Sequence, residues 1–382
     1  MKNRITIGMD LGDKKHVACI LDAEGNETIR KSIVNTPNAI TKFMRDFPHA
    51  TVGIEACVHS PWISRLLMEL GATVYVGNPR KLRCIWDADD KTDTRDARML
   101  ARIVRFDPEL LSPITHRSED AQRDLQRIKA RDALVNARTK LVNSVRSSIK
   151  LLGGRLPSGW SARSFAKKAE EELSEEMLMM LAPLLEAMQT LTDKITAYDK
   201  SIEQLAESKY PETARLRQVK GVGPITALAF ILTIDDPSRF KKSRDVGPYL
   251  GLVPKRDQSG DTDKQLHITK AGNTYLRQLL VGSAHYILGP FGEDCDLRRH
   301  GEKIAARGGK NAKKRAVVAV TRKLSVLLHR LWVSGEVYEP LRNQGGRPKP
   351  RPESRRRAPS AAKPRRASAA HSRPAAAVAA TG

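Results

Sequence analysis

The 382-residue sequence is poor in several features that define large protein classes. It holds only four cysteines and no CxxC pair, which argues against a disulfide scaffold and against a zinc knuckle. No run approaches the ~20 apolar residues of a membrane span, and the first ten residues lack the apolar core of a signal peptide. Secreted, membrane and zinc-finger proteins are therefore excluded, and a reducing cytoplasm is the expected setting.

Acidic residues are scarce relative to basic ones. The chain has 67 Lys and Arg against 43 Asp and Glu, which gives a net charge of +24 and a pI near 10.1. Such a surface attracts polyanions, with nucleic acid as the leading candidate. Residues 342–382 hold eleven of the basic residues and one acid, Glu353, among many Ala, Pro and Ser residues. We predict that this stretch is disordered and acts as a flexible cationic arm, while the body stays basic without it.

Residues 1–112 alternate strand and helix signals. Alternating apolar and polar residues predict strands at 5–9, 16–21, 27–34, 51–55 and 73–76, and helices are predicted at 37–46 and 61–70. Three meandering strands followed by strand–helix units indicate a mixed α/β sheet, and the ribonuclease-H-like fold has that order.

Residues 113–212 change to the pattern of long helices. Apolar residues step by threes and fours in a coiled-coil-like seam formed by Leu173, Met177, Met180, Leu184, Met188, Leu191, Ile195, Tyr198, Ile202 and Leu205. Pro183 is expected to kink or restart this helix. Residues 117–152 can supply an opposing helix. The resulting hairpin suits dimerisation, and an intramolecular spacer is equally compatible.

Residues 213–341 are predicted to be mostly helical, with a Gly- and Pro-rich interruption at 235–260. Gly221 and Gly223, followed by Pro224 and an apolar helix, resemble a helix-hairpin-helix whose backbone N–H groups hold phosphates. The same letters also fit a plain helical corner with a glycine C-cap and proline at the first helical position. The basic composition favours the nucleic-acid interpretation.

Four acids are candidates for chemistry. Asp10 ends the first predicted strand in GMDLG, Glu55 ends another in VGIEA, and Asp93 and Asp96 share one face at the start of a helix. In a ribonuclease-H-like sheet these strand ends are adjacent and the helix packs across them, so four carboxylates converge. Such a cluster repels itself unless divalent cations neutralise it, and two Mg²⁺ ions some 3.5–4 Å apart are the usual solution.

Each acid also has an ordinary interpretation. Asp10 can be a loop acid after a strand, Asp93 a first-turn acid favoured by the helix dipole, and Asp96 a surface acid. Their joint order on these elements favours a metal site. Cys57 and His59 lack a second ligand pair and are interpreted as packing or loop residues.

A second candidate is Ser259, which is expected with Gly260 in a polar loop before a helix rich in Arg and Lys. Alone, Ser-Gly is ordinary turn chemistry. The nearby Lys255, Arg256 and Lys270 are candidate nucleic-acid contacts.

The motifs GMDLG, GIEA, KTDTRDARMLA, GVGPITA and SG…ITKAGNTYLR together carry a specific resemblance. The sequence resembles the DEDD transposases of bacterial insertion sequences, the bridge-RNA-guided recombinases, over about residues 4–335. The KTDxxDA motif and the SG…KAGN segment are highly specific, whereas GVGP is not. The basic tail departs from the family pattern.

The resemblance implies four parts: a RuvC-like domain at 1–112, a coiled-coil dimerisation region at 113–212, a transposase domain at 213–341 and the tail at 342–382. The acidic tetrad would bind Mg²⁺, with Mn²⁺ as a substitute, and Ser259 would form a covalent phosphoserine with DNA. Implied partners are donor and target DNA, a noncoding bridge RNA, and further copies in a dimer or tetramer at the bacterial nucleoid. The 5% aromatic content suits a protein that reads nucleic-acid shape and backbone.

Two other functions compete with this one. A RuvC-like junction nuclease would use the tetrad and a metal-activated water, and would leave no covalent adduct. A non-catalytic nucleic-acid scaffold is disfavoured because all four acids are intact. Helices of some 30 residues span roughly 45 Å, so we predict that one chain's Ser259 meets the tetrad of a partner chain.

Overall fold

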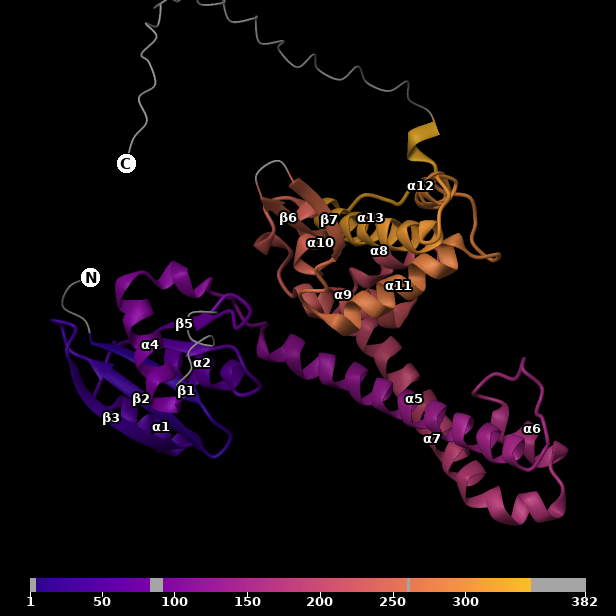
Figure 1. Cartoon of the computed structure of the whole chain (residues 1–382), viewed down its shortest axis with the longest axis horizontal. Helices are drawn as coiled ribbons and strands as arrows, with labels where there is room; N and C mark the ends of the chain where they lie inside the picture. Colours follow the sequence, from indigo (N-terminus) through magenta and orange to yellow (C-terminus); the bar gives the residue numbers. More distant parts are fainter. Residues whose placement is uncertain (1–4, 83–91, 260–261, 345–382) are drawn as a thin grey trace, which may run out of the picture.

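The computed structural model describes residues 5–82, 92–259 and 262–344. Figure 1 shows an N-terminal α/β unit, a long helical hairpin and a mostly helical C-terminal unit. The two outer units are joined through the long helices that form the hairpin.

The N-terminal unit is a five-stranded sheet in the order β3-β2-β1-β4-β5. The strands are β1 (Thr6–Leu11), β2 (Lys15–Leu21), β3 (Glu27–Val34), β4 (Thr51–Glu55) and β5 (Thr73–Gly77). The first three pair in antiparallel fashion, and β1, β4 and β5 are parallel. The predicted mixed α/β sheet is confirmed, with strand bounds close to those expected.

Helices cover both faces of this sheet. α1 (Pro37–Met44) and α2 (Ser60–Glu69) pack on one face, where Ile40, Phe43, Ile63 and Leu67 join the strand residues in one buried core. α4 (Asp93–Phe106) packs on the other face. The side chain of Thr92 caps its start by accepting a hydrogen bond from the Arg95 N–H.

Two long helices, α5 (Glu119–Leu151) and α7 (Glu175–Lys209), form the hairpin and pack against each other within one chain. Ser118 and Ser174 cap their starts. α7 continues through Pro183, so the expected restart of the helix there is wrong.

One member of the predicted seam, Met180, is wrong, near the far end of the hairpin. Met180 is 54% exposed, whereas Leu181 is 6% and Leu185 1% exposed. The reason is an additional helix, α6 (Phe165–Glu172), which the sequence did not predict. Its Phe165 shares a buried cluster with Leu181 and Leu185 and draws that face of α7 inward.

The C-terminal unit surrounds the buried helix α9 (Pro224–Ile234). Around it lie α8 (Thr213–Arg217), α10 (Val246–Tyr249), α11 (Thr274–Leu288), α12 (Asp296–Ala305) and α13 (Ala312–Ser334). Ala121 and Leu125 of α5 and Ile202 and Ala206 of α7 enter the same core, which anchors the base of the hairpin. No helix in the described part of the chain is long and apolar enough to cross a membrane.

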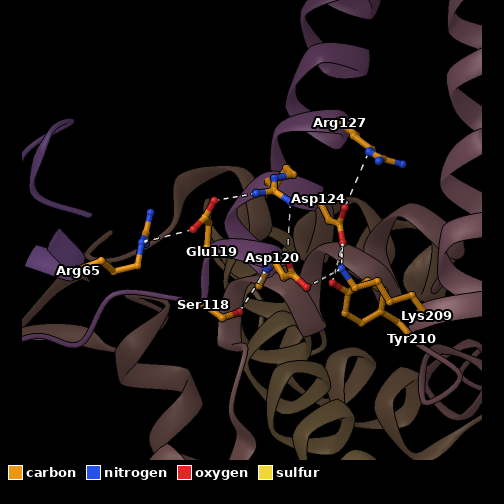
Figure 2. Close-up of polar contacts among 10 residues, drawn as sticks. Arg65, Ser118, Glu119, Asp120, Asp124, Arg127, Lys209 and Tyr210 are labelled. Atoms are coloured by element: carbon orange, nitrogen blue, oxygen red, sulfur yellow. Dashed lines mark hydrogen bonds and ion pairs between the residues drawn. The ribbon is translucent and has the colours of Figure 1, made fainter. Parts of the chain in front are cut away.

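A polar network ties the start of α5 to its neighbours (Figure 2). The Ser118 N–H and Oγ donate to the Asp235 carboxylate at 2.7 and 2.8 Å, and Lys209 Nζ and Tyr210 OH donate to Asp124 at 2.9 and 2.8 Å. Burial, helped by the bond to Asp124, raises the pKa of Tyr210 to about 12. The first turns of α5 are thereby fixed to the end of α7 and to the residue that follows α9.

Candidate active site

Asp10 and Glu55 stand at the carboxyl ends of two neighbouring strands. β1 and β4 run parallel, and Met9 of β1 lies opposite Ile54 of β4. One residue further along each strand, Asp10 and Glu55 lie side by side, with roughly 4.8 Å between the strands. Both residues are half-buried. The predicted adjacency of these two strand ends is confirmed.

Two glycines, each two residues before one of these acids, determine how closely α4 approaches this face. A Cβ atom on Gly8 would lie 2.0 Å from the carbonyl oxygen of Ala97 and 2.2 Å from the backbone nitrogen of Ala101. A Cβ atom on Gly53 would lie 2.3 Å from Cγ2 of Val104. The helix backbone therefore rests directly on β1, which only a residue without a side chain permits.

α4 runs antiparallel to β1. Its last turn is held at the far end of the sheet, where Arg105 Nη1 donates to the carbonyl of Asp22 at 3.0 Å. Asp22 directly follows Leu21, and Leu21 pairs with Thr6 at the start of β1. The first turn of α4 consequently lies at the opposite edge, beside the carboxyl end of β1.

The direction of α4 sets where its two acids lie. Gly8 contacts both Ala97 and Ala101 of α4, and Asp93 and Asp96 precede these residues in the helix. Asp10 lies two strand residues beyond Gly8 in the same direction, roughly 6.6 Å. Asp93 is exposed, and Asp96, one turn further into the helix, is 9% exposed. The first turn of α4, which carries Asp93 and Asp96, therefore lies toward the edge of the sheet that carries Asp10 and Glu55.

The chemistry of this edge suits a hard cation. Carboxylate oxygens are the ligands that Mg²⁺ and Mn²⁺ prefer. Within residues 5–82, 92–259 and 262–344, however, no three His, Cys, Asp or Glu side chains are grouped closely enough to hold a metal ion. The edge supplies the donors without a closed ligand cluster.

Sequence reasoning missed a polar pair at the same edge. His59 Nε2 lies 3.1 Å from Oδ1 of Asp13, which joins the segments that follow β4 and β1. Below them the buried His16 contacts Asn35 at 3.1 Å, and burial lowers the pKa of His16 despite that bond. Asp13 and His59 each follow a tetrad acid by three or four residues, a signal that is readable only once the strands are aligned.

Ser259 lies on a β-hairpin and not in the predicted loop before a helix. β6 (Pro254–Ser259) pairs in antiparallel fashion with β7 (Thr262–Ile268), and Ser259 is opposite Thr262. Gly260 and the side chain of Ser259 lie outside what the structure describes. Lys255 and Arg256 are exposed residues of β6.

The base of this hairpin is held by two tight turns. Lys270 is exposed, has a left-handed φ of 53°, and its N–H donates to the carbonyl of Gly251 at 3.1 Å. A Cβ atom on Gly272 would lie 2.0 Å from the carbonyl oxygen of Tyr249. The buried Arg277 donates to the carbonyls of Leu250 and Ala271 at 3.0 and 2.9 Å, and burial lowers its pKa. The hairpin therefore projects from a rigid support.

Gly221 and Gly223 differ in their surroundings. Gly221 has φ of 91°, and a Cβ atom there would lie 2.8 Å from Cδ1 of Tyr286 in α11. Gly223 begins α9 without a side-chain cap and has open space around its Cα. The helix preceding them has only five residues, so the helix-hairpin-helix stays a prediction.

The four acids and Ser259 lie in different units of the chain. Figure 1 shows β1 and α4 in the N-terminal unit, and β6 and β7 in the C-terminal unit. The elements that carry the four acids belong to one unit, and the strand that carries Ser259 belongs to another.

Two family models match the chain. Residues 7–152 match DEDD_Tnp_IS110, described as "Transposase", and residues 213–289 match Transposase_20, described as "Transposase IS116/IS110/IS902 family". A "Probable family 20 transposase" of Pseudomonas aeruginosa is 27% identical over 78% of this chain and 88% of its own length. The transposase for element IS1328 of Yersinia enterocolitica is 29% identical over 74% and 84%. That for IS1111A of Coxiella burnetii is 26% identical over 88% and 92%.

Proposed function

The chain belongs to the DEDD-type transposases of insertion sequences, and on this premise we propose that it cuts and rejoins DNA through a covalent bond between Ser259 and a DNA phosphate. The hydroxyl oxygen of Ser259 attacks phosphorus, the bond from phosphorus to the departing sugar oxygen breaks, and a proton ends on that oxygen. Because the phosphodiester energy is kept in the phosphoserine, a second sugar hydroxyl can reverse the step and join new strand ends.

Asp10, Glu55, Asp93 and Asp96 are the proposed ligands of a divalent cation, Mg²⁺ or Mn²⁺. When bound, such ions stabilise the negative charge on phosphate oxygens during transfer. The chain's own contribution is positioning, since two carboxylates stand on strand ends and two on the first turn of a helix. The approach of α4 to Gly8, at 2.0 Å from a hypothetical Cβ atom, is the observation that carries this part of the proposal.

We also propose that one active centre draws on two chains. The tetrad edge and the β6–β7 hairpin lie in different units, and a helix of some 30 residues covers roughly 45 Å. A partner chain that docks along the α5–α7 hairpin can place its Ser259 at the tetrad of the first chain. A monomer then holds no complete centre and does not cut DNA.

The proposed partners are donor DNA, target DNA and a noncoding bridge RNA. Base pairing with the RNA would select the DNA sequence, so the protein needs contacts to shape and backbone. The net charge of +24 and the low aromatic content support such contacts. Gly221, Gly223, Lys255, Arg256 and Lys270 are the proposed nucleic-acid contacts in the C-terminal unit.

The test is to trap the protein–DNA adduct. Wild-type protein, bridge RNA, DNA and Mg²⁺ should give a species that survives denaturation, and peptide mapping should place the phosphate on Ser259. Ser259→Ala should form no adduct and cut no strand while it still binds DNA. The matched control is Ser334→Ala, which removes an exposed serine hydroxyl of the same unit and should react normally.

The alternative outcome is cleavage without any adduct. Strand cutting by Ser259→Ala at the wild-type rate would assign the attack to water at the tetrad, as in a junction nuclease, and would refute the phosphoserine. Absence of both cleavage and adduct in wild-type protein, with DNA and RNA bound, would leave a non-catalytic scaffold.

A further inference from the structure

A group of cations on α12 and α13 lies outside both proposed reaction centres. His300, Lys303 and Arg307 follow one another at helical spacing, so they share one side of α12 and the turn after it. α13 packs closely alongside, because a Cβ atom on Gly301 would lie 2.7 Å from Cγ2 of Val320. Lys323 of α13 is near enough for its charge to act on His300. We call these four residues the α12–α13 patch.

No ion pair neutralises the cations of the patch in the described part of the chain. Lys303, Arg307 and Lys323 are exposed, and none of them forms an ion pair there. Burial lowers the pKa of His300 first, and the charges of Lys323, Arg307 and Lys303 lower it further. By contrast, Arg298 on another side of α12 is paired with Glu302 at 2.9 Å. Arg298 is therefore paired with an acid, whereas Lys303, Arg307 and Lys323 are exposed and form no ion pair in the described residues.

The shape and composition of the patch indicate which polyanion fits it. The α12 cations extend over roughly 10 Å, the rise of about three phosphates along one strand of a duplex. The patch contains no Phe, Tyr or Trp, whereas surfaces for single strands commonly combine cations with such stacking platforms. These features favour the outer backbone of a duplex.

The cationic tail begins beside the same helix. Asn343 donates from its backbone N–H and from Nδ2 to Oδ2 of Asp296, the first residue of α12, at 3.1 and 2.6 Å. Figure 1 shows the described chain ending next to α12. Of the eleven Lys and Arg residues in 342–382, all but Arg342 follow this anchor in the sequence. The basic residues that follow Asn343 in the sequence are therefore attached to the chain at the start of α12, the helix that also carries His300 and Lys303, and they add to the positive charge of the protein.

We infer that the α12–α13 patch binds the phosphate backbone of duplex DNA at a site separate from the strand-cutting centre. The inference rests on the proposed function only in that its partner is DNA. It requires neither the phosphoserine nor the metal. The patch would hold the DNA that flanks the cut and would not read its sequence, since its contacts are to phosphates.

The test compares two triple variants of the full chain in a Ser259→Ala background, where cutting cannot interfere. The patch variant is Lys303→Gln/Arg307→Gln/Lys323→Gln. The control is Lys129→Gln/Lys140→Gln/Lys150→Gln, which removes three exposed cations from α5. Fluorescence anisotropy gives the dissociation constant for a labelled DNA duplex at several salt concentrations. Losing three phosphate contacts should reduce the slope of log K against log salt by about 2.7, while the control slope should stay unchanged.

Three results would overturn the inference. The first is a patch variant that keeps the wild-type salt slope, and the second is an equal loss of slope in the two triple variants. The third is a weaker binding of duplex RNA while the binding of duplex DNA is unchanged. Thermal melting checks that both triples are folded. If the patch triple is unfolded, Lys323→Gln alone decides, with an expected slope reduction of about 0.9. The assay measures DNA binding by a variant that does not cut DNA. Its result can therefore be interpreted even if the phosphoserine mechanism is refuted.

Discussion

Replacing Gly8 by alanine should uncouple α4 from the sheet edge that carries the tetrad. The new Cβ atom would lie 2.0 Å from a helix carbonyl oxygen, whereas ordinary contacts begin at 3.4 Å. The helix must therefore retreat by about 1.4 Å, because backbone atoms cannot rotate away. A displacement of that size at catalytic groups costs about 100-fold in rate, and overpacking costs about 1–3 kcal/mol of stability.

The assay is strand cleavage under single-turnover conditions, with a melting curve for each variant. Gly8→Ala should cut DNA about 100-fold more slowly and melt several degrees lower. Gly282→Ala in α11 is the matched control, since nothing lies within 4 Å of the Cβ atom there. It should cut normally, and its stability should stay the same or rise by up to about 1 kcal/mol.

Gly53 offers a sharper test because its obstacle is a side chain. A Cβ atom there meets Cγ2 of Val104 at 2.3 Å and other atoms only at 3.4 Å. Gly53→Ala should slow cleavage, and Gly53→Ala/Val104→Ala should recover much of the rate because the obstructing methyl is gone. Gly8→Ala with wild-type cleavage, or a double variant no faster than Gly53→Ala alone, would refute the positioning role of the glycines.

Three further expectations concern charge. Burial pushes the pKa of Asp124 up, yet the hydrogen bonds from Lys209 and Tyr210 outweigh this and hold it below its ordinary value. The charged carboxylate contributes about 2 kcal/mol to the free energy of unfolding above pH ~4, and this contribution is lost as the pH falls through the folded-state pKa. Asp124→Asn should therefore melt lower than wild type at pH 7 and at the same temperature as wild type in acid. A difference in melting temperature that stays constant with pH would contradict this. Asp10→Ala should abolish cleavage, and chelator should stop wild type until Mg²⁺ or Mn²⁺ is restored; full activity in chelator would exclude a metal role. Deleting residues 343–382 should weaken nucleic-acid binding mainly at low salt and flatten its salt dependence, and an unchanged slope would show that the tail makes no contact.

The N-terminal sheet could be predicted from sequence because its strands alternate cleanly between apolar and polar residues. Thr51–Glu55 and Glu27–Val34 have the bounds that the pattern indicates. The approach of Asp10 to Glu55 followed from strand order alone. The role of Gly8 did not, because only the packed helix reveals how little space lies above it.

The β6–β7 hairpin could not be predicted, since PKRDQSGDTDKQLHI is polar at nearly every position and has no apolar face. Its pairing is imposed by the turns at Gly251 and Gly272, whose close backbone contacts fix where the strands start. The seam of α7 failed at Met180 for a different reason. The sequence of α7 is compatible with two apolar heptad patterns, one with Met180 and one with Leu181. Packing of the unpredicted α6 buries the pattern that contains Leu181.

The most direct test of a serine and a tetrad acting at one centre is a mixture of two inactive proteins. Asp10→Ala and a size-tagged Ser259→Ala are combined under conditions that exchange subunits, and denaturing gels follow cleavage and adduct. A mixed dimer then holds one intact centre, so partial cleavage should return, with the adduct only on the Asp10→Ala chain. A mixture that stays inactive although mixed dimers form would contradict assembly between chains, and an adduct on the Ser259→Ala chain would contradict the assigned nucleophile.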